Sequence, residues 1–187
     1  MIEFLKSREK YLLVSLVSTA GFLALFTYLS RNWMLVMTVS GQECFPYTHW
    51  VVRKTGDIHA GEYVAFWGHG IPNTPDKVLW GKKVLAKGGD RIIAEKTRGT
   101  GTIRVNGVDR PFPVQGMVHV YDRNGNRIKT LVVYGHDTFG RPLPMIRSMV
   151  IPEGKYLVVG GTERSYDSRY WGLVDASWVV GRAHPVI

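Results

Sequence analysis

The chain has 187 residues, enough for one domain with its own core after an apolar N-terminal segment is set aside. Its formal charge is +9, but the basic residues are scattered and motifs for reading or stacking bases are missing, which argues against a nucleic-acid partner. A single cysteine excludes a disulfide within the chain, and six widely spaced histidines offer no metal spacing, so neither metal nor cofactor is expected.

The first predicted element is an uncharged apolar stretch, residues 11–29. About 20 such residues in a helix cross a hydrocarbon core of roughly 30 Å. The flanking charge is asymmetric, since Lys6, Arg8 and Lys10 precede the stretch and Arg31 follows it. Positive charge concentrates on the cytoplasmic side of membrane helices. The pattern therefore predicts a single-pass anchor with a cytoplasmic N-terminus.

This interpretation divides the chain into a cytoplasmic N-terminus at 1–10, a transmembrane anchor at 11–31 and a domain at 32–187 on the far side of the membrane. A cleaved signal peptide is the alternative. The apolar stretch is longer than a usual signal-peptide core, and no clear A-x-A cleavage site follows it. We therefore expect an uncleaved anchor, with the lipid bilayer as one partner.

Downstream of residue 33, short apolar and β-branched runs alternate with turn signals. Asn106-Gly107 and Asn124-Gly125 lie between such runs and indicate hairpins. No long segment has helical period, so we expect a mainly β domain. Residues 97–150 follow no clear pattern and are interpreted as an inserted β subdomain. Strands are expected at 34–40, 61–67, 78–86, 92–95, 102–105, 118–121, 130–134, 155–161 and 177–183.

Cys44 lies in a turn-rich segment soon after the apolar stretch, two residues before Pro46. A catalytic nucleophile needs an exposed and rigidly held position, which a proline-fixed turn provides. The alternative is a small apolar residue that fills a gap in the core. The segment alone does not decide between them.

Lys82 opens a second candidate segment, which ends with Gly-Gly-Asp at 88–90. In a strand, alternation places Lys82 on one face with Val84 and Ala86, and Lys83 on the other. Small apolar neighbours would remove water from the Lys82 amine, and burial disfavours the charged form of a lysine. A neutral amine acts as a general base. The alternative is an ordinary solvated lysine.

The third candidate segment is a dense polar stretch, residues 160–172, between two apolar runs. Asp167 and Arg169 are spaced to form a charge-assisted bond that fastens a loop. The hydroxyl of Ser165 would orient a neighbouring amine. A surface loop with a fortuitous ion pair is the alternative.

Four segments follow one another along the chain: Cys44-x-Pro, GEYVAF at 61–66, KK…GGD at 82–90 and SYDSRYWGLV at 165–174. Together and in this order they resemble the type I signal peptidase superfamily. The last segment is the most specific, and the resemblance covers nearly everything after the apolar stretch. The first segment is most similar to the TraF-type branch, the peptidases of conjugative-transfer systems. That branch has Ser-x-Pro-x-Gly-x-Tyr where this chain reads CFPYTHW.

The resemblance implies a signal-peptidase-like β-fold and a role for each candidate residue. Cys44 falls where the nucleophilic serine stands, and Lys82 falls on the general-base lysine. Ser165 would hold the lysine amine, while Asp167 and Arg169 would brace the loop. The backbone N–H of Cys44 would help to stabilise the oxyanion.

Gln42 is a further candidate oxyanion donor through its side-chain amide, with a solvated turn residue as an equal alternative. Three departures from the family pattern accompany the thiol: Thr48 replaces a glycine, Trp50 replaces a tyrosine, and Gly160-Gly161-Thr162 replaces Gly-Asp-Asn. An ordinary thiol has a pKa of about 8.5, so a lysine deprotonates it more easily than a hydroxyl. Random loss would more often leave alanine or glycine, so the cysteine favours an active enzyme.

The sequence therefore predicts a membrane-anchored protease with a Cys44/Lys82 dyad that processes a pilin or another conjugative-transfer or type IV secretion substrate. A thioester intermediate favours attack by amines, so cyclisation of the pilin is a further expectation. Other proteins of the transfer apparatus are expected partners. Two alternatives stay open: a catalytically inactive scaffold subunit of that apparatus, and a general signal peptidase.

Overall fold

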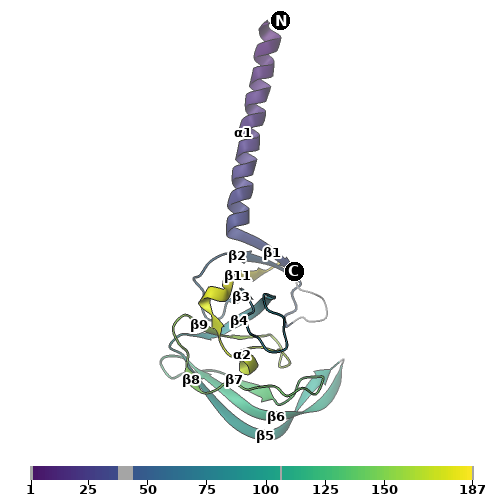
Figure 1. Ribbon diagram of the computed structural model, residues 1–187, viewed down its shortest axis with the longest axis vertical. Coiled ribbons are helices and arrows are strands. Elements are labelled where there is room, and N and C mark those ends of the chain that lie inside the picture. Colours follow the sequence, from purple (N-terminus) through teal and green to yellow (C-terminus); the bar gives the residue numbers. More distant parts are fainter. Residues whose placement is uncertain (1, 38–43, 106, 187) are drawn as a thin grey trace. The chain divides into compact units, whose positions relative to one another are not determined.

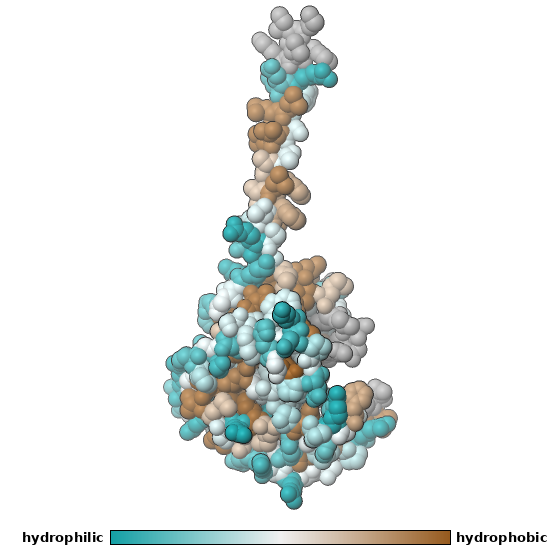
Figure 2. All heavy atoms as spheres, in the orientation of Figure 1, coloured by the Kyte–Doolittle hydropathy of each residue, from teal (hydrophilic) through white to brown (hydrophobic). Residues whose placement is uncertain are grey.

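The structure is a computed structural model that describes residues 2–37, 44–105 and 107–186. It divides into two compact units, residues 1–34 and 35–187. The first unit consists mainly of helix α1 (Ile2–Asn32). From Arg8 to Asn32 this helix is long and apolar enough to cross a membrane, and Figure 2 shows apolar side chains along it. A signal sequence near an N-terminus has the same length and composition.

The second unit contains a sheet of seven strands and a sheet of four (Figure 1). The prediction of a mainly β domain after an apolar N-terminal helix is confirmed. The first sheet has the strand order β1-β2-β11-β3-β4-β9-β10, and the second has the order β7-β6-β5-β8. The strands are β1 (Trp33–Met37), β2 (His49–Arg53), β3 (Tyr63–Trp67), β4 (Leu79–Lys87), β5 (Arg91–Val105), β6 (Val108–Tyr121), β7 (Arg127–Tyr134), β8 (Met149–Val150), β9 (Lys155–Val159), β10 (Val174–Asp175) and β11 (Val179–Pro185).

Strand β4 lies between β3 and β9 in the first sheet. Lys82 and Val84 are both buried on one face of it, and Lys83 is exposed on the other, as alternation predicts. A bulge between Val84 and Ala86 then interrupts the alternation. Ala86 therefore packs in a different core cluster from Val84, which corrects the expectation of one common face.

The second sheet is built around two long hairpins. Gly107 and Gly125 have positive φ angles of 78° and 85°, which the tight turns require. Strand β5 continues from Arg91 to Val105, where the sequence predicted two short strands with a gap. A shift in register between Lys96 and Gly99 accommodates the glycine-rich middle, so pairing with β6 continues through it.

Two core clusters flank the first sheet. One cluster joins it to the second sheet and includes Ala86, Ile92, Val118, Leu157 and Tyr170. Tyr170 belongs to helix α2 (Ser168–Trp171), which contacts both β9 and β7. The sequence did not predict β2, β8, β10, α2 or the 3-10 helix Ala176–Trp178. The last four are too short to show a period, whereas β2 begins within the turn-rich segment around Cys44. Helix α2 places the polar segment 160–172 beside the first sheet.

Candidate active site

Cys44 lies in a bend just before β2 and is partly exposed. Its backbone carbonyl accepts a hydrogen bond from the N–H of Gly161 at 2.9 Å. This bond ties the Cys44 bend to the loop that follows β9. The thiol is therefore accessible and held by a distant segment of the chain.

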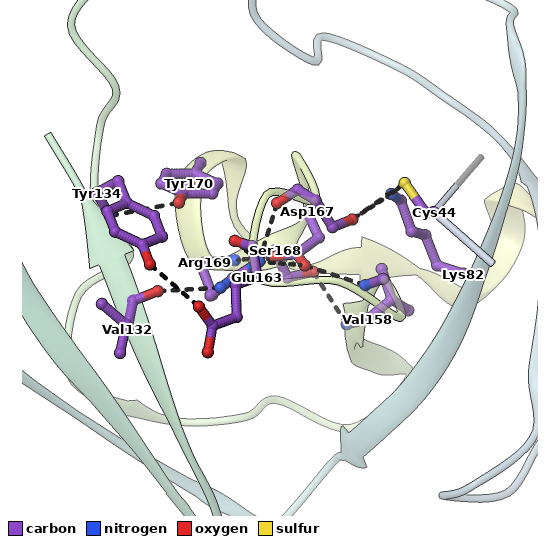
Figure 3. A network of polar contacts seen from close by, with 12 residues as sticks. Cys44, Lys82, Val132, Tyr134, Val158, Glu163, Asp167, Ser168, Arg169 and Tyr170 are labelled. Atoms are coloured by element: carbon purple, nitrogen blue, oxygen red, sulfur yellow. Dashed lines mark hydrogen bonds and ion pairs between the residues drawn. The ribbon is translucent and has the colours of Figure 1, made fainter. Parts of the chain in front are cut away.

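Lys82 projects from β4 toward the same point and is only 1% exposed. Its Nζ donates to Cys44 Sγ at 3.0 Å and to Ser165 Oγ at 2.8 Å. The Ser165 hydroxyl in turn donates to Sγ at 3.2 Å. The three polar atoms thus form a triangle, and Figure 3 shows the Lys82 amine directed at the Cys44 sulfur.

One aromatic ring and two polar side chains surround the Lys82 amine. Trp80, two residues earlier on β4, lies with its ring centre 5.3 Å from Nζ. Among the described residues, the groups that accept hydrogen bonds from Nζ are the Cys44 sulfur and the Ser165 hydroxyl, and neither is a carboxylate. The amine therefore lies within hydrogen-bond reach of both the thiol and the serine hydroxyl.

Two consecutive glycines allow the loop after β9 to pass close to the thiol. A Cβ at Gly160 would overlap the Ser165 hydroxyl and lie 3.1 Å from the Cys44 Cβ. A Cβ at Gly161 would lie 2.5 Å from the Cys44 carbonyl oxygen. A side chain at Gly160 would displace the serine, and a side chain at Gly161 would displace the Cys44 bend. Gly161, which stands where the family has an aspartate, therefore has a steric reason here.

The loop is braced by a buried ion pair between Asp167 and Arg169. The guanidinium binds the carboxylate in bidentate fashion, with Nε–Oδ1 at 2.8 Å and Nη2–Oδ2 at 3.0 Å. Asp167 is fully buried and Arg169 is 3% exposed. Burial alone would lower the pKa of Arg169, but the Asp167 carboxylate raises it above its ordinary value, so the guanidinium stays charged.

Arg169 extends this brace in two directions (Figure 3). Its Nη2 donates to the Ser165 carbonyl at 2.9 Å, which fixes the backbone that carries the hydroxyl. Its Nη1 donates to the Val132 carbonyl on β7 at 3.0 Å. The ion pair therefore connects the second sheet to the loop of Ser165.

Two further residues in this network have supporting contacts. Ser168 Oγ accepts from the Val158 N–H on β9 at 3.0 Å. Tyr134 on β7 donates its hydroxyl to Glu163 at 3.2 Å. Burial and then the Glu163 carboxylate raise the pKa of Tyr134 to about 12, so the hydroxyl remains a donor at neutral pH. No local pattern in the sequence indicates a role for these residues, although Ser168 and Glu163 lie inside the polar segment 160–172.

We expect the Asp167→Asn substitution to lower the free energy of unfolding by about 3 kcal/mol, because it leaves the buried Arg169 guanidinium without a counter-charge. Urea denaturation of the full chain in detergent measures this loss. Asp175→Asn is the matched control, since Asp175 pairs with Lys155 at 2.8 Å at the surface. Exposed pairs contribute little, so its effect should be far smaller. Equal losses in the two variants would contradict the bracing role.

An aromatic cluster forms one wall of the site. Phe45, Tyr47, Trp50 and Tyr63 meet edge to face, with ring centres 5.0 to 6.4 Å apart. The cluster lines a cleft of about 470 Å³ that also contains Cys44. Trp50, which replaces the family's tyrosine, is 5% exposed within it. The aromatic rings of the Cys44 segment thus fix the bend and give the cleft an apolar lining.

The structure therefore brings five of the six sequence-selected residues together: Cys44, Lys82, Ser165, Asp167 and Arg169. Gln42, the sixth, lies outside the described residues. In the described part of the chain, no group of three or more His, Cys, Asp or Glu side chains is arranged to hold a metal.

The chain matches one protein-family model and several known proteins. The sequence model described as "Signal peptidase, peptidase S26" matches residues 8–187. Signal peptidase IB of Staphylococcus aureus strains Mu50, N315 and MW2 is similar, with 32% identity over 135 residues in each. The match covers 69% of this chain and 60% of each relative, so the chain spans about three fifths of the length of the curated relatives it matches.

Proposed function

Since the chain belongs to the signal peptidase S26 family, we propose that it is a membrane-anchored peptidase with Cys44 as nucleophile and Lys82 as general base. The observation that carries the proposal is the 3.0 Å contact between the buried Lys82 amine and the Cys44 sulfur. A nucleophile within hydrogen-bond reach of a base, itself oriented by a third group, is the arrangement that covalent catalysis needs. Here Ser165 is the orienting group.

The proposed reaction has two steps. The neutral Lys82 amine takes the Cys44 proton, the thiolate attacks the scissile carbonyl, and the Lys82 ammonium protonates the leaving amine as the thioester forms. Water then attacks the thioester, loses a proton to Lys82 and restores the thiol. The Cys44 N–H and the Gln42 amide are the proposed oxyanion donors. Asp167 and Arg169 act at a distance, by holding the backbone of Ser165.

The proposed substrate is a pilin or another protein of a conjugative-transfer or type IV secretion system, on the strength of the TraF-like CFPYTHW segment. Attack on the thioester by the substrate's own amine, in place of water, would cyclise the pilin. The relatives named Signal peptidase IB support a second candidate, a general signal peptidase. A cell that exports its other proteins normally without this chain, but lacks mature pilin, would distinguish the two.

The proposed location follows from α1. The apolar segment from Arg8 to Asn32 is an uncleaved anchor in the bacterial inner membrane, with basic residues on the cytoplasmic side. Residues 32–187 then form the periplasmic peptidase domain, in which 97–150 is an inserted β subdomain. Other components of the transfer apparatus would dock on this domain.

The test uses the fact that the chain contains one cysteine. We expect iodoacetamide to alkylate Cys44 rapidly near neutral pH and to abolish processing of the pilin, which mass spectrometry of the product detects. The Cys44→Ser variant is the control, because it has no thiol and any residual activity should resist the reagent. If the fully alkylated chain still matures the pilin, Cys44 is not the nucleophile. Slow labelling that leaves processing intact would favour the inactive scaffold.

A further inference from the structure

A second cavity, of about 250 Å³, adjoins the cleft at Cys44. Asn73 and Thr74 line both spaces, so the two are neighbours on one loop. The second cavity is rich in rings, and neither Cys44 nor Lys82 lines it. Its aromatic lining comprises Phe112, Tyr134, His136, Phe139, Tyr166 and Tyr170. An aromatic cavity thus lies next to the cleft that contains Cys44.

Phe139 stands at the mouth of this cavity and is 82% exposed. Its loop is nevertheless rigid, because the Asp137 carboxylate accepts from the backbone N–H of Phe139 and of Arg141, each at 2.9 Å. The Arg141 guanidinium binds the same carboxylate at 2.6 Å and lies 5.2 Å from the Phe139 ring centre. The turn therefore presents the Phe139 ring to solvent beside the other rings of the cavity.

The wall shared by the two spaces is tied to the candidate active site. Tyr166, the residue after Ser165, donates its hydroxyl to the Pro72 carbonyl at 3.0 Å. This bond joins the Ser165 loop to the loop that carries Asn73. Tyr166 also stacks on Tyr170, with ring centres 5.8 Å apart. The loop that holds Ser165 therefore also holds Tyr166, a lining residue of the second cavity.

We propose that the second cavity is a distal subsite that binds an aromatic side chain of the peptide cleaved at Cys44, an inference that rests on the proposed peptidase function. The Asp137 and Arg141 charges at the cavity are paired with each other, and six of its lining residues carry rings. Aromatic rings in edge or offset geometry attract one another beyond the effect of the area they bury. Substrate choice therefore depends on a residue away from the scissile bond.

The test measures binding of dodecapeptides to the full-length Cys44→Ala chain in detergent. A fluorescein-labelled alanine–serine peptide carries one phenylalanine, which is moved position by position, and fluorescence anisotropy gives Kd. We expect one position at which phenylalanine tightens binding about three- to tenfold. Phe139→Ala should remove that gain. Val108→Ala should leave the gain intact. Val108 is an exposed apolar residue on β6, and it lines neither cavity.

The outcomes separate this inference from the peptidase assignment. A gain that persists in Phe139→Ala, or no gain at any position, overturns the subsite. If that occurs while the unsubstituted chain still matures pilin, the peptidase assignment stands alone. A gain that depends on Phe139, in a chain whose unsubstituted form cleaves nothing, supports an aromatic peptide site and removes the catalytic role of Cys44.

Discussion

Substitution of Cys44 by alanine should reduce processing of the proposed pilin substrate by a factor of about 10⁶, the loss seen when the nucleophile is removed from a serine protease. Alanine keeps the backbone carbonyl that accepts from Gly161, so the bend should remain in place. The measurement is kcat/KM on the purified full chain in detergent, with product mass as the readout. The melting temperature should be nearly unchanged, because Cys44 is only partly buried.

Cys44→Ser is the informative comparison for the chemistry. A serine hydroxyl is harder to deprotonate than a thiol, so the same Lys82 amine should activate it less well. We expect activity between those of the unsubstituted chain and the alanine variant. The ester intermediate should also shift the products from cyclised toward hydrolysed pilin, because esters favour amines over water less than thioesters do. An alanine variant with normal activity would remove Cys44 from the mechanism.

The elements that sequence alone predicted well are those with a repeating local signal. The alternation from Lys82 to Val84 correctly places a lysine on the buried face of β4, since period two is a property of every strand. Likewise, the Asn-Gly pairs mark the turns of the two long hairpins. By contrast, β5 reads as two strands because glycines interrupt its middle, whereas pairing with β6 carries the strand through.

The geometry of the candidate site depends on long-range contacts, which local patterns do not encode. Cys44 and Ser165 are 121 residues apart in sequence, and their side chains meet at 3.2 Å. The grouping was predicted from the family resemblance, because the motifs occur in the family's order and each motif assigns a role to one of these residues. The resemblance did not explain why Gly161 stands where the family has an aspartate. The reason is steric, and it becomes visible only when the Cys44 bend lies against the loop.

The Lys82→Met substitution should lower kcat/KM by about 10² to 10⁴, the contribution typical of a general base. Methionine preserves the length and apolar stem of the lysine but has no amine to accept the Cys44 proton. Lys82 is 1% exposed, so replacing a buried amine with a thioether should leave the melting temperature similar or higher. A loss of activity without a loss of stability therefore indicates chemistry and not folding.

Lys83→Met is the matched control, since it alters the same residue type one position along β4. Lys83 lies on the exposed face, with its amine 5.8 Å from the ring centre of Tyr63. An exposed contact of this kind contributes about 0.5–1 kcal/mol to stability, and its loss leaves the Cys44–Lys82–Ser165 triangle untouched. An inactive Lys83 variant beside an active Lys82 variant would move the base to the other face of β4. Because strand alternation places the two amines on opposite faces of β4, this pair of variants tests which face carries the base.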